Sequence, residues 1–360
     1  MTQLHEQDDV TVRQIPLARW PAIGWMVLVL VVAAVAAWEW KMRSLGLQAG
    51  DLDDGLSFWT VERRRIAAGD HGRVVIFGSS RILFDTDLDV WEEVTGRRPI
   101  QLALVGTNPR PFLRRFAEDS DFDGLVVVGV TPELFFSDFT SAFPEFLGLN
   151  DLWRDESPSQ RFGHRIGLVL SRYFAFLDDE YSLGKLIDRV DIPDREGPRR
   201  PYLEVWKLSE SFAGRQYRMW PRLETDRRLR DHAVRVWLER DRGGPDDATV
   251  TRVIEDVRQS VEKIRKRGGE VVFVRSPSGG AYYERESRNT PRDATWDRLL
   301  RETGAFGIHF EDYPEMRGLD LPELSHLSRE SATRFTRAYV GVLAREIPWL
   351  RLPPSAEPST

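Results

Sequence analysis

The sequence changes abruptly from apolar to small and polar residues near position 78. Val74–Phe77 has the composition of a buried strand, and Gly78-Ser79-Ser80-Arg81 follows it directly. A polar segment with a turn then leads into a short helix. In parallel α/β sheets, ligands bind at the carboxyl ends of strands, where the amide groups of the next helix also point. The pattern therefore predicts a sheet that presents the Ser80 hydroxyl at the end of its first strand.

Apolar runs alternate with amphipathic segments along much of the chain. We expect strands at 73–77, 100–105, 124–130, 270–275 and 307–310, and helices at 87–95, 110–117, 247–267, 296–303 and 328–345. The run 124–130 is apolar throughout, as in strands that are covered on both faces. This order predicts the α/β class, as a flavodoxin-like three-layer α/β/α sandwich around a parallel sheet.

Residues 131–246 do not continue this alternation. They are rich in aromatic residues and arginine, and proline and glycine interrupt them often. We expect a mostly helical insertion, which either packs on the sheet as a cap or forms a lid over a substrate groove. Because it begins where a strand ends, it is expected over the edge of the sheet that carries Ser80.

An apolar segment near the amino end has the composition of a membrane span. Residues 22–37 contain no charge, and Trp20, Trp38 and Trp40 flank them. With these tryptophans the segment approaches the roughly 20 residues that cross a bilayer. We predict a transmembrane anchor at 22–40; a cleaved signal peptide is the alternative, because Ala34-Val35-Ala36 matches a cleavage pattern.

The anchor divides the chain into expected parts. We predict a short cytoplasmic tail at 1–21, a lead-in at 41–70, the α/β domain at 71–350 and a disordered tail at 351–360. Basic residues on the two sides of the segment nearly balance, so they do not decide its orientation. Since most of the chain follows the segment, we expect a single-pass protein of a bacterial inner membrane with a periplasmic domain.

Composition excludes several kinds of chemistry. The 51 basic and 57 acidic residues give a net charge of −6, which provides no reason to expect a nucleic-acid partner. The chain has no cysteine, which excludes disulfides, thiolate catalysis and cysteine-bound zinc. Gly78-Ser79-Ser80 lacks the lysine of a phosphate-binding loop, and no metal-ligand spacing surrounds His326. We therefore expect neither a metal nor another cofactor.

One of the six histidines stands in a setting suited to catalysis. His326 lies in a loop before the last expected helix, and Glu323 precedes it by three residues. A carboxylate can orient one ring nitrogen of a histidine while the other nitrogen accepts a proton from a serine. The remaining histidines precede the membrane segment or lie in a turn, in the insertion or inside an expected strand: His5, His71, His164, His232 and His309.

These motifs resemble those of the SGNH (GDSL-like) hydrolase superfamily, over most of residues 70–136 and 247–346. Its members carry a serine after strand one, a glycine after strand two, G-x-N-D after strand three and D-x-x-H before the last helix. Here Ser79 replaces the acid of the first motif, and Glu323 replaces the aspartate of the last. The resemblance implies a triad of Ser80, His326 and Glu323.

The resemblance also implies an oxyanion hole, with backbone donors at Ser80 and Gly106. Thr131 stands where the family has asparagine, and its hydroxyl is a poorer and less directed donor. The loss of one such donor costs about 3 kcal/mol in other serine enzymes. Asn108 is a possible substitute because it lies next to Gly106 in sequence. This departure is the main argument against catalysis.

Three further residues are candidates for substrate binding. Arg81 follows the serine, and Arg275 and Ser276 follow the fourth strand at the same edge of the sheet. The alternatives are an ion pair of Arg81 with Asp85 or Asp87, and an ordinary loop after Arg275.

The resemblance implies an activity as well as a site. Membrane-tethered relatives act on cell-envelope or exported polysaccharides as O-acetyltransferases or esterases. The implied partners are an acylated glycan or polysaccharide, the membrane itself and a membrane-bound protein that donates acyl groups. The alternative is a protein of the same fold that binds a glycan or serves as a scaffold without catalysis.

Overall fold

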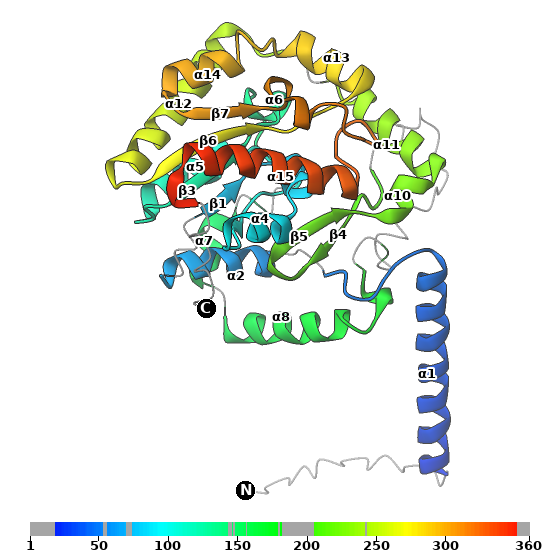
Figure 1. The fold of residues 1–360 in the computed structure, drawn as a ribbon. Helices are drawn as coiled ribbons and strands as arrows, with labels where there is room; N and C mark the ends of the chain where they lie inside the picture. Colours follow the sequence, from blue (N-terminus) through cyan, green and yellow to red (C-terminus); the bar gives the residue numbers. More distant parts are fainter. Residues whose placement is uncertain are drawn as a thin grey trace, which may run out of the picture. The chain divides into compact units, whose positions relative to one another are not determined.

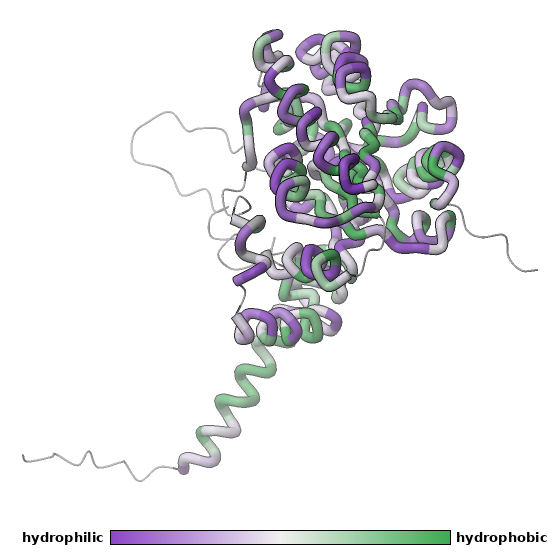
Figure 2. The backbone as a smooth tube through the Cα atoms, turned by 90° about the vertical axis from the view of Figure 1, so that its left-hand side faces the viewer, coloured by the Kyte–Doolittle hydropathy of each residue, from purple (hydrophilic) through white to green (hydrophobic). Residues whose placement is uncertain are grey.

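The computed structural model describes residues 19–52, 56–69, 74–142, 146, 148–155, 157–178, 181, 205–241 and 243–350. The chain forms two compact units, Met1–Leu47 and Gln48–Thr360. In the first unit, α1 (Trp20–Ser44) has 25 residues, and an 18-residue stretch of it has a mean hydropathy of 2.2, so it is long and apolar enough to cross a membrane. It is hydrophobic along most of its length (Figure 2). The predicted tail at 351–360 and most of the tail at 1–21 lie outside the described residues.

The second unit is built on a five-stranded parallel sheet (Figure 1). The spatial order is β2-β1-β3-β6-β7, and each neighbouring pair is parallel. The strands are β1 (Val74–Phe77), β2 (Ile100–Gln101), β3 (Leu125–Gly129), β6 (Glu270–Arg275) and β7 (Phe306–His309). The prediction of an α/β fold with a parallel sheet is confirmed. The strand order reverses between β1 and β3, which is where doubly wound sheets open toward a ligand.

Both faces of the sheet are covered, because alternate strand residues enter two different cores. Val75 and Phe77 pack with one set of helices, whereas Val74 and Ile76 pack with another. The first set comprises α2 (Leu56–Ala67), α5 (Arg110–Asp119), α12 (Asp247–Lys266) and α14 (Trp296–Thr303). The second set comprises α3 (Ser80–Asp85), α4 (Leu88–Thr95) and α15 (Arg329–Glu346). Hydrophobic segments accordingly gather inside the unit (Figure 2).

Most predicted elements differ from the observed ones by one or two residues at an end, and two differences can be described locally. The second strand, expected at 100–105, ends at Gln101, although Leu102 N and Leu104 N still donate to Ile76 and Gly78 at 2.8 and 3.0 Å. Isolated hydrogen bonds therefore extend the pairing with the first strand beyond the end of β2. The helix expected at 87–95 begins one residue later because Asp87 caps its amino end.

The region before β1 is more than a lead-in. Trp59 of α2 is buried in the first core and donates its indole N–H to Leu102 O at 3.1 Å. Helix α2 is thus an integral part of the α/β unit.

The described part of the insertion is mainly helical, and it also contains a hairpin that the sequence analysis did not expect. Its described helices are α6 (Pro132–Phe135), α7 (Leu149–Asp155), α8 (Pro158–Ser171), α10 (Pro221–Thr225) and α11 (Arg227–Glu239). It also contains an antiparallel hairpin of β4 (Ser209–Phe212) and β5 (Gln216–Met219). Ser209-Glu210-Ser211-Phe212 has no apolar run, so nothing in its pattern indicated a strand. The hairpin packs against α3, where Tyr217 stacks on Phe84 with ring centroids 5.3 Å apart.

Candidate active site

Ser80 is the first residue of α3 and lies just beyond the carboxyl end of β1. Two glycines make this turn possible. A Cβ on Gly78 would lie 2.1 Å from Ile82 Cγ2, and a Cβ on Gly129 would lie 2.4 Å from Ile82 Cβ. Ile82 therefore fits between β1 and β3 only because both positions lack a side chain. The packing of Ile82 against the two glycines fixes the position of the first turn of α3.

Ser80, His326 and Glu323 form one chain of hydrogen bonds. His326 Nε2 lies 2.9 Å from Ser80 Oγ, and His326 Nδ1 lies 2.8 Å from Glu323 Oε1. His326 and Glu323 are 1% and 0% exposed, whereas Ser80 is half-buried. The serine is thus partly accessible to solvent, whereas the two groups that would activate it are buried. Phe84 packs against the imidazole, with ring centroids 4.7 Å apart.

Glu323 is held by donors on both of its oxygens. Oε1 also accepts from His326 N at 2.6 Å, and Oε2 accepts the indole N–H of Trp237. Leu324, between the acid and the base, has a φ of +71°, a left-handed conformation that a leucine rarely adopts. The loop is therefore bent so that the carboxylate and the imidazole of residues three apart meet.

Asp85 connects the helix of the serine to the loop of the histidine. Its Oδ1 accepts from Leu327 N at 2.9 Å, and its backbone oxygen accepts from Thr336 Oγ1 at 3.1 Å. Oδ2 has no hydrogen-bond partner among the described residues. Burial raises the pKa of Asp85 to about 7, although the charge of His326 acts in the opposite direction. Sequence analysis did not identify this residue as part of the site.

The predicted oxyanion donors do not all face the serine. Thr131 Oγ1 lies 2.5 Å from Ser79 Oγ, so these two hydroxyls satisfy each other. The amide of Asn108 donates to the carbonyls of Leu134, Ser137 and Phe139 at 2.8, 3.4 and 3.0 Å. The expectation that Asn108 replaces the missing side-chain donor therefore does not fit this arrangement, because its amide holds the loop after α6.

Two backbone donors remain available. The N–H groups of Ser80 and Gly106 have no hydrogen-bond acceptor among the described residues. Gly106 has a φ of +57°, which a residue with a side chain would adopt only with strain. Ser80 comes after β1 and Gly106 comes after β2, and these two strands are neighbours in the sheet. Both amides therefore remain candidates for the oxyanion hole that the resemblance implies.

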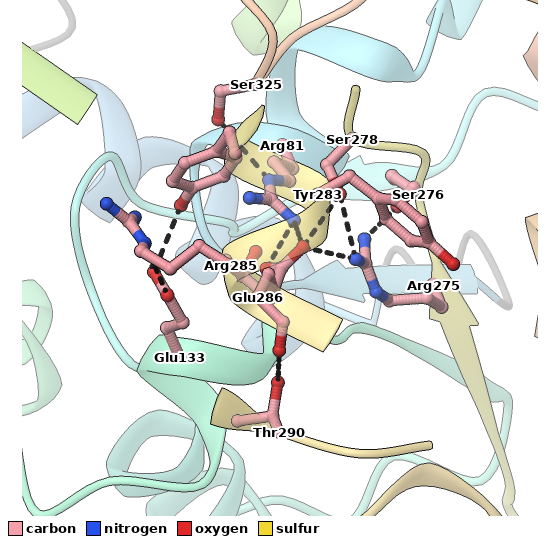
Figure 3. Close-up of polar contacts among 12 residues, drawn as sticks. Arg81, Glu133, Arg275, Ser276, Ser278, Tyr283, Arg285, Glu286, Thr290 and Ser325 are labelled. Atoms are coloured by element: carbon pink, nitrogen blue, oxygen red, sulfur yellow. Dashed lines mark hydrogen bonds and ion pairs between the residues drawn. The ribbon is translucent and has the colours of Figure 1, made fainter. Parts of the chain in front are cut away.

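Arg81, Arg275 and Ser276 are buried rather than exposed to a groove. Arg81 donates to both oxygens of Glu286, at 2.8 and 3.1 Å, and Arg275 Nη2 donates to Glu286 at 2.5 Å (Figure 3). Neither Asp85 nor Asp87 is the ion-pair partner that the alternative reading expected for Arg81. Burial alone would raise the pKa of Glu286, but the charges of Arg275 and Arg81 outweigh it and lower that pKa. Both arginines are therefore held by a buried carboxylate.

Sequence analysis missed the helix that supplies this network. Helix α13 (Gly280–Asn289) places Tyr282, Arg285 and Glu286 on one face. Tyr282 lies between two cations, with Arg81 and Arg285 at 4.9 and 4.8 Å from its ring centroid. Arg285 pairs with Glu133 of α6 at 3.2 Å (Figure 3). The spacing of these residues, three and four apart after a glycine, was the available signal.

The other described histidines have different roles. His309 is buried beside Arg275 and Arg292, and burial lowers its pKa to about 2, so it stays neutral. His232 stacks on Trp206, with ring centroids 4.5 Å apart, and His164 packs against Phe58. His5 and His71 lie outside the described residues. Across the described ranges, no group of three histidine or acidic residues is placed to hold a metal ion.

Comparison with known proteins adds no identification. No protein-family model matches the chain, and no curated protein matches its sequence significantly. The class of the site therefore rests on geometry: a half-buried serine, a buried histidine and a buried carboxylate linked in series at the carboxyl edge of a parallel sheet.

Proposed function

We propose that this protein is a membrane-anchored, SGNH-like serine esterase or O-acyltransferase that acts on a cell-envelope or exported polysaccharide. The observation that carries the proposal is the hydrogen-bond chain from Ser80 through His326 to Glu323. Ser80 begins α3, and His326 follows it by 246 residues in the loop that also holds Glu323, yet the three side chains meet at the distances of a triad. A structural serine at a turn does not require such a partner.

The geometry supports an acyl-enzyme mechanism. His326 Nε2 accepts the proton of Ser80 as Oγ attacks the ester carbonyl, and Glu323 stabilises the imidazolium that forms. The backbone N–H groups of Ser80 and Gly106 stabilise the oxyanion. His326 then returns the proton to the departing alcohol, which leaves an ester on Ser80. Attack by water completes hydrolysis, whereas attack by a sugar hydroxyl completes transfer.

The architecture is consistent with the SGNH-like arrangement. The sheet order corresponds to 2-1-3-4-5, the flavodoxin-like order, and the site lies at its switch point between β1 and β3. Gly106 follows β2 and Thr131 follows β3, at the places that the resemblance assigns to oxyanion donors. The departure at Thr131 remains, and its hydroxyl is occupied by Ser79.

Trp237 supports a carbohydrate substrate. Four described aromatic residues of the insertion are buried in the core: Phe135, Phe136, Tyr217 and Trp220. Trp237 is instead half-buried, and its ring lies 6.0 Å from the ring of His326. An aromatic face beside the base provides a surface on which a sugar ring can stack. The apolar helix α1 supports a position at a membrane, and we place the catalytic unit in the periplasm.

Turnover of a simple ester tests the proposal. The full chain, reconstituted in lipid nanodiscs, is expected to hydrolyse p-nitrophenyl acetate, and Ser80→Ala is expected to abolish the activity. Ser79→Ala is the matched control and should retain most of it. Product analysis with an added polysaccharide acceptor separates transfer from hydrolysis. Activity in Ser80→Ala equal to that of the wild type would contradict the proposal.

A second candidate is a non-catalytic glycan-binding or scaffold protein with the same fold. The observation that favours it is the occupation of both candidate side-chain donors, Thr131 and Asn108, by structural hydrogen bonds. This candidate predicts that a folded protein neither cleaves esters nor reacts at Ser80, and that Ser80→Ala leaves glycan binding unchanged.

A further inference from the structure

Helix α8 has an unusual distribution of side chains. It begins with a capping box between Ser157 and Gln160 and lies at the periphery of the second unit (Figure 1). Only its residues His164, Leu168 and Ser171 face the protein, where His164 packs against Phe58 of α2 with ring centroids 5.6 Å apart. With 3.6 residues per turn, these three positions form one narrow stripe.

The face opposite this stripe is apolar and exposed. On a helical wheel its side chains fall within about 100° of arc, directly away from the packed stripe. They are Phe162, Ile166, Val169 and Leu170, which are 66%, 44%, 53% and 41% exposed, and Tyr173 follows at 68%. A helix that faced only water would carry polar residues there.

Two interior glycines also weaken α8 as an isolated helix in water. Gly163 and Gly167 lie in its interior, and a Cβ at either position would meet nothing within 4 Å. Neither glycine is therefore required by close packing within the described residues. Because glycine weakens a helix interior, the sequence is suited to a helix whose exposed face is supported by something else.

The basic residues beside the apolar face of α8 indicate that a lipid surface supports this face. Arg161, Arg165 and Arg172 are exposed and fall on one flank of the apolar arc. Helices that lie in the plane of a membrane combine an apolar face with basic residues that reach anionic headgroups. Phenylalanine and tyrosine within the apolar set suit the same boundary.

The end of α8 is hydrogen-bonded to the segment that follows the anchor in the sequence. Gly50 N donates to Ser171 O, the last residue of α8, at 2.7 Å. Gly50 follows shortly after Ser44, where α1 ends. A short stretch of chain, at about 3.6 Å or less per residue, therefore links the anchor to the residue that is bonded to α8.

We propose that α8 is an interfacial helix whose face of Phe162, Ile166, Val169, Leu170 and Tyr173 inserts into a bilayer containing anionic lipid. The inference rests on the proposed anchoring by α1 and not on catalysis. It gives the protein a second membrane contact, formed by the insertion rather than by the anchor.

Depth-dependent quenching tests this contact in the full chain. Because the protein has no cysteine, single cysteines at Val169, at Val31 of α1 and at exposed Gln259 of α12 can each carry an environment-sensitive fluorophore. In liposomes of phosphatidylcholine with phosphatidylglycerol, spin-labelled lipid should quench the labels at 169 and 31 several-fold more than the label at 259. Replacing Arg161, Arg165 and Arg172 by glutamine should weaken quenching at 169 and leave quenching at 31 unchanged.

The outcomes separate the two claims. Quenching at 31 without quenching at 169 would overturn the interfacial helix and leave the anchor intact. Quenching at 169 without quenching at 31 would support the helix and contradict the anchor. A blue-shifted but unquenched label at 169 would overturn the lipid assignment in favour of a protein partner. Equal emission spectra at 259 in all variants show that the fold is retained.

Discussion

Trp237 donates its indole N–H to Glu323 Oε2, the carboxylate oxygen that does not hold His326 Nδ1. Arg285 fixes the backbone at this point by donating to Trp237 O at 2.8 Å and to Leu238 O at 3.1 Å. The insertion therefore supplies a direct hydrogen bond to the acid of the candidate triad. Its helix α11 therefore belongs to the site.

We predict that Trp237→Phe slows acylation of Ser80 about 10- to 100-fold. The change keeps an aromatic ring but removes one donor to a buried carboxylate, and hydrogen bonds to charged groups contribute about 1.5–3 kcal/mol. The measurement is the rate of inactivation by a fluorophosphonate. Trp206→Phe, in the same insertion, is the control and should react at the wild-type rate. Equal rates for both variants would mean that Trp237 does not position Glu323.

We predict that Glu323→Gln lowers activity by about 100- to 10,000-fold, as loss of the orienting carboxylate does in other triads. Three donors face this carboxylate: His326 N, His326 Nδ1 and Trp237 Nε1. An amide offers an acceptor on one side only, so at least one donor would face an NH₂ group. Ester hydrolysis by the variant measures the effect. The control is Glu93→Gln on the exposed face of α4, and a Glu323→Gln variant as active as this control would exclude Glu323 from the mechanism.

We predict that Thr131→Val reduces stability more than activity. The Thr131 hydroxyl is paired with buried Ser79, and its loss leaves that partner unsatisfied, at a cost of about 1–3 kcal/mol in the free energy of unfolding. Urea denaturation and ester hydrolysis should be measured on the same preparation. A fall in activity of about 100-fold or more in a folded variant would instead identify Thr131 as an oxyanion donor.

We predict that Asp85→Asn changes how stability depends on pH. The pKa of Asp85 is raised from 3.8 to about 7 by burial, against the charges of His326 and Arg81 and with that of Glu323. An acidic group whose pKa is raised by folding stabilises the folded state below pH 4. This contribution is lost as the pH rises toward 7. Relative to the wild type, the variant should therefore gain up to about 4 kcal/mol between pH 4 and pH 8.

Denaturant titrations of wild type and Asp85→Asn at several pH values test this. The variant preserves the acceptor for Leu327 N, so its fold should be retained. A difference in unfolding free energy that stays constant with pH would show that Asp85 is ionised in both the folded and the unfolded states across this range.

The sequence was sufficient to bring Ser80, His326 and Glu323 together. In a parallel sheet the carboxyl ends of strands share one edge, so a serine after the first strand and a histidine before the last helix are neighbours whatever lies between them. The resemblance, rather than this rule, pointed to Gly106 and Thr131, which follow β2 and β3. It could not decide which hydrogen bonds their polar neighbours form, and Asn108 is bonded to a loop that the pattern did not describe.

Long-range polar contacts were beyond prediction. Arg81 pairs with Glu286, 205 residues away, whereas the sequence offered the nearby acids Asp85 and Asp87. Trp237 and Glu323 are 86 residues apart and meet only because α11 folds back over the edge of the sheet. Hydrophobic periodicity reports which face of an element is buried, but it carries no information on which buried charge faces which. The β4–β5 hairpin was missed because its strands lack an apolar period.

Covalent labelling tests the central claim most directly. The full chain in nanodiscs should react with a serine-directed fluorophosphonate, and peptide mapping should place one equivalent on Ser80. His326→Ala should abolish the reaction, while Ser79→Ala should retain it. A folded wild-type protein that is not labelled, or a label that persists in Ser80→Ala, would contradict the assignment of Ser80 as an activated nucleophile.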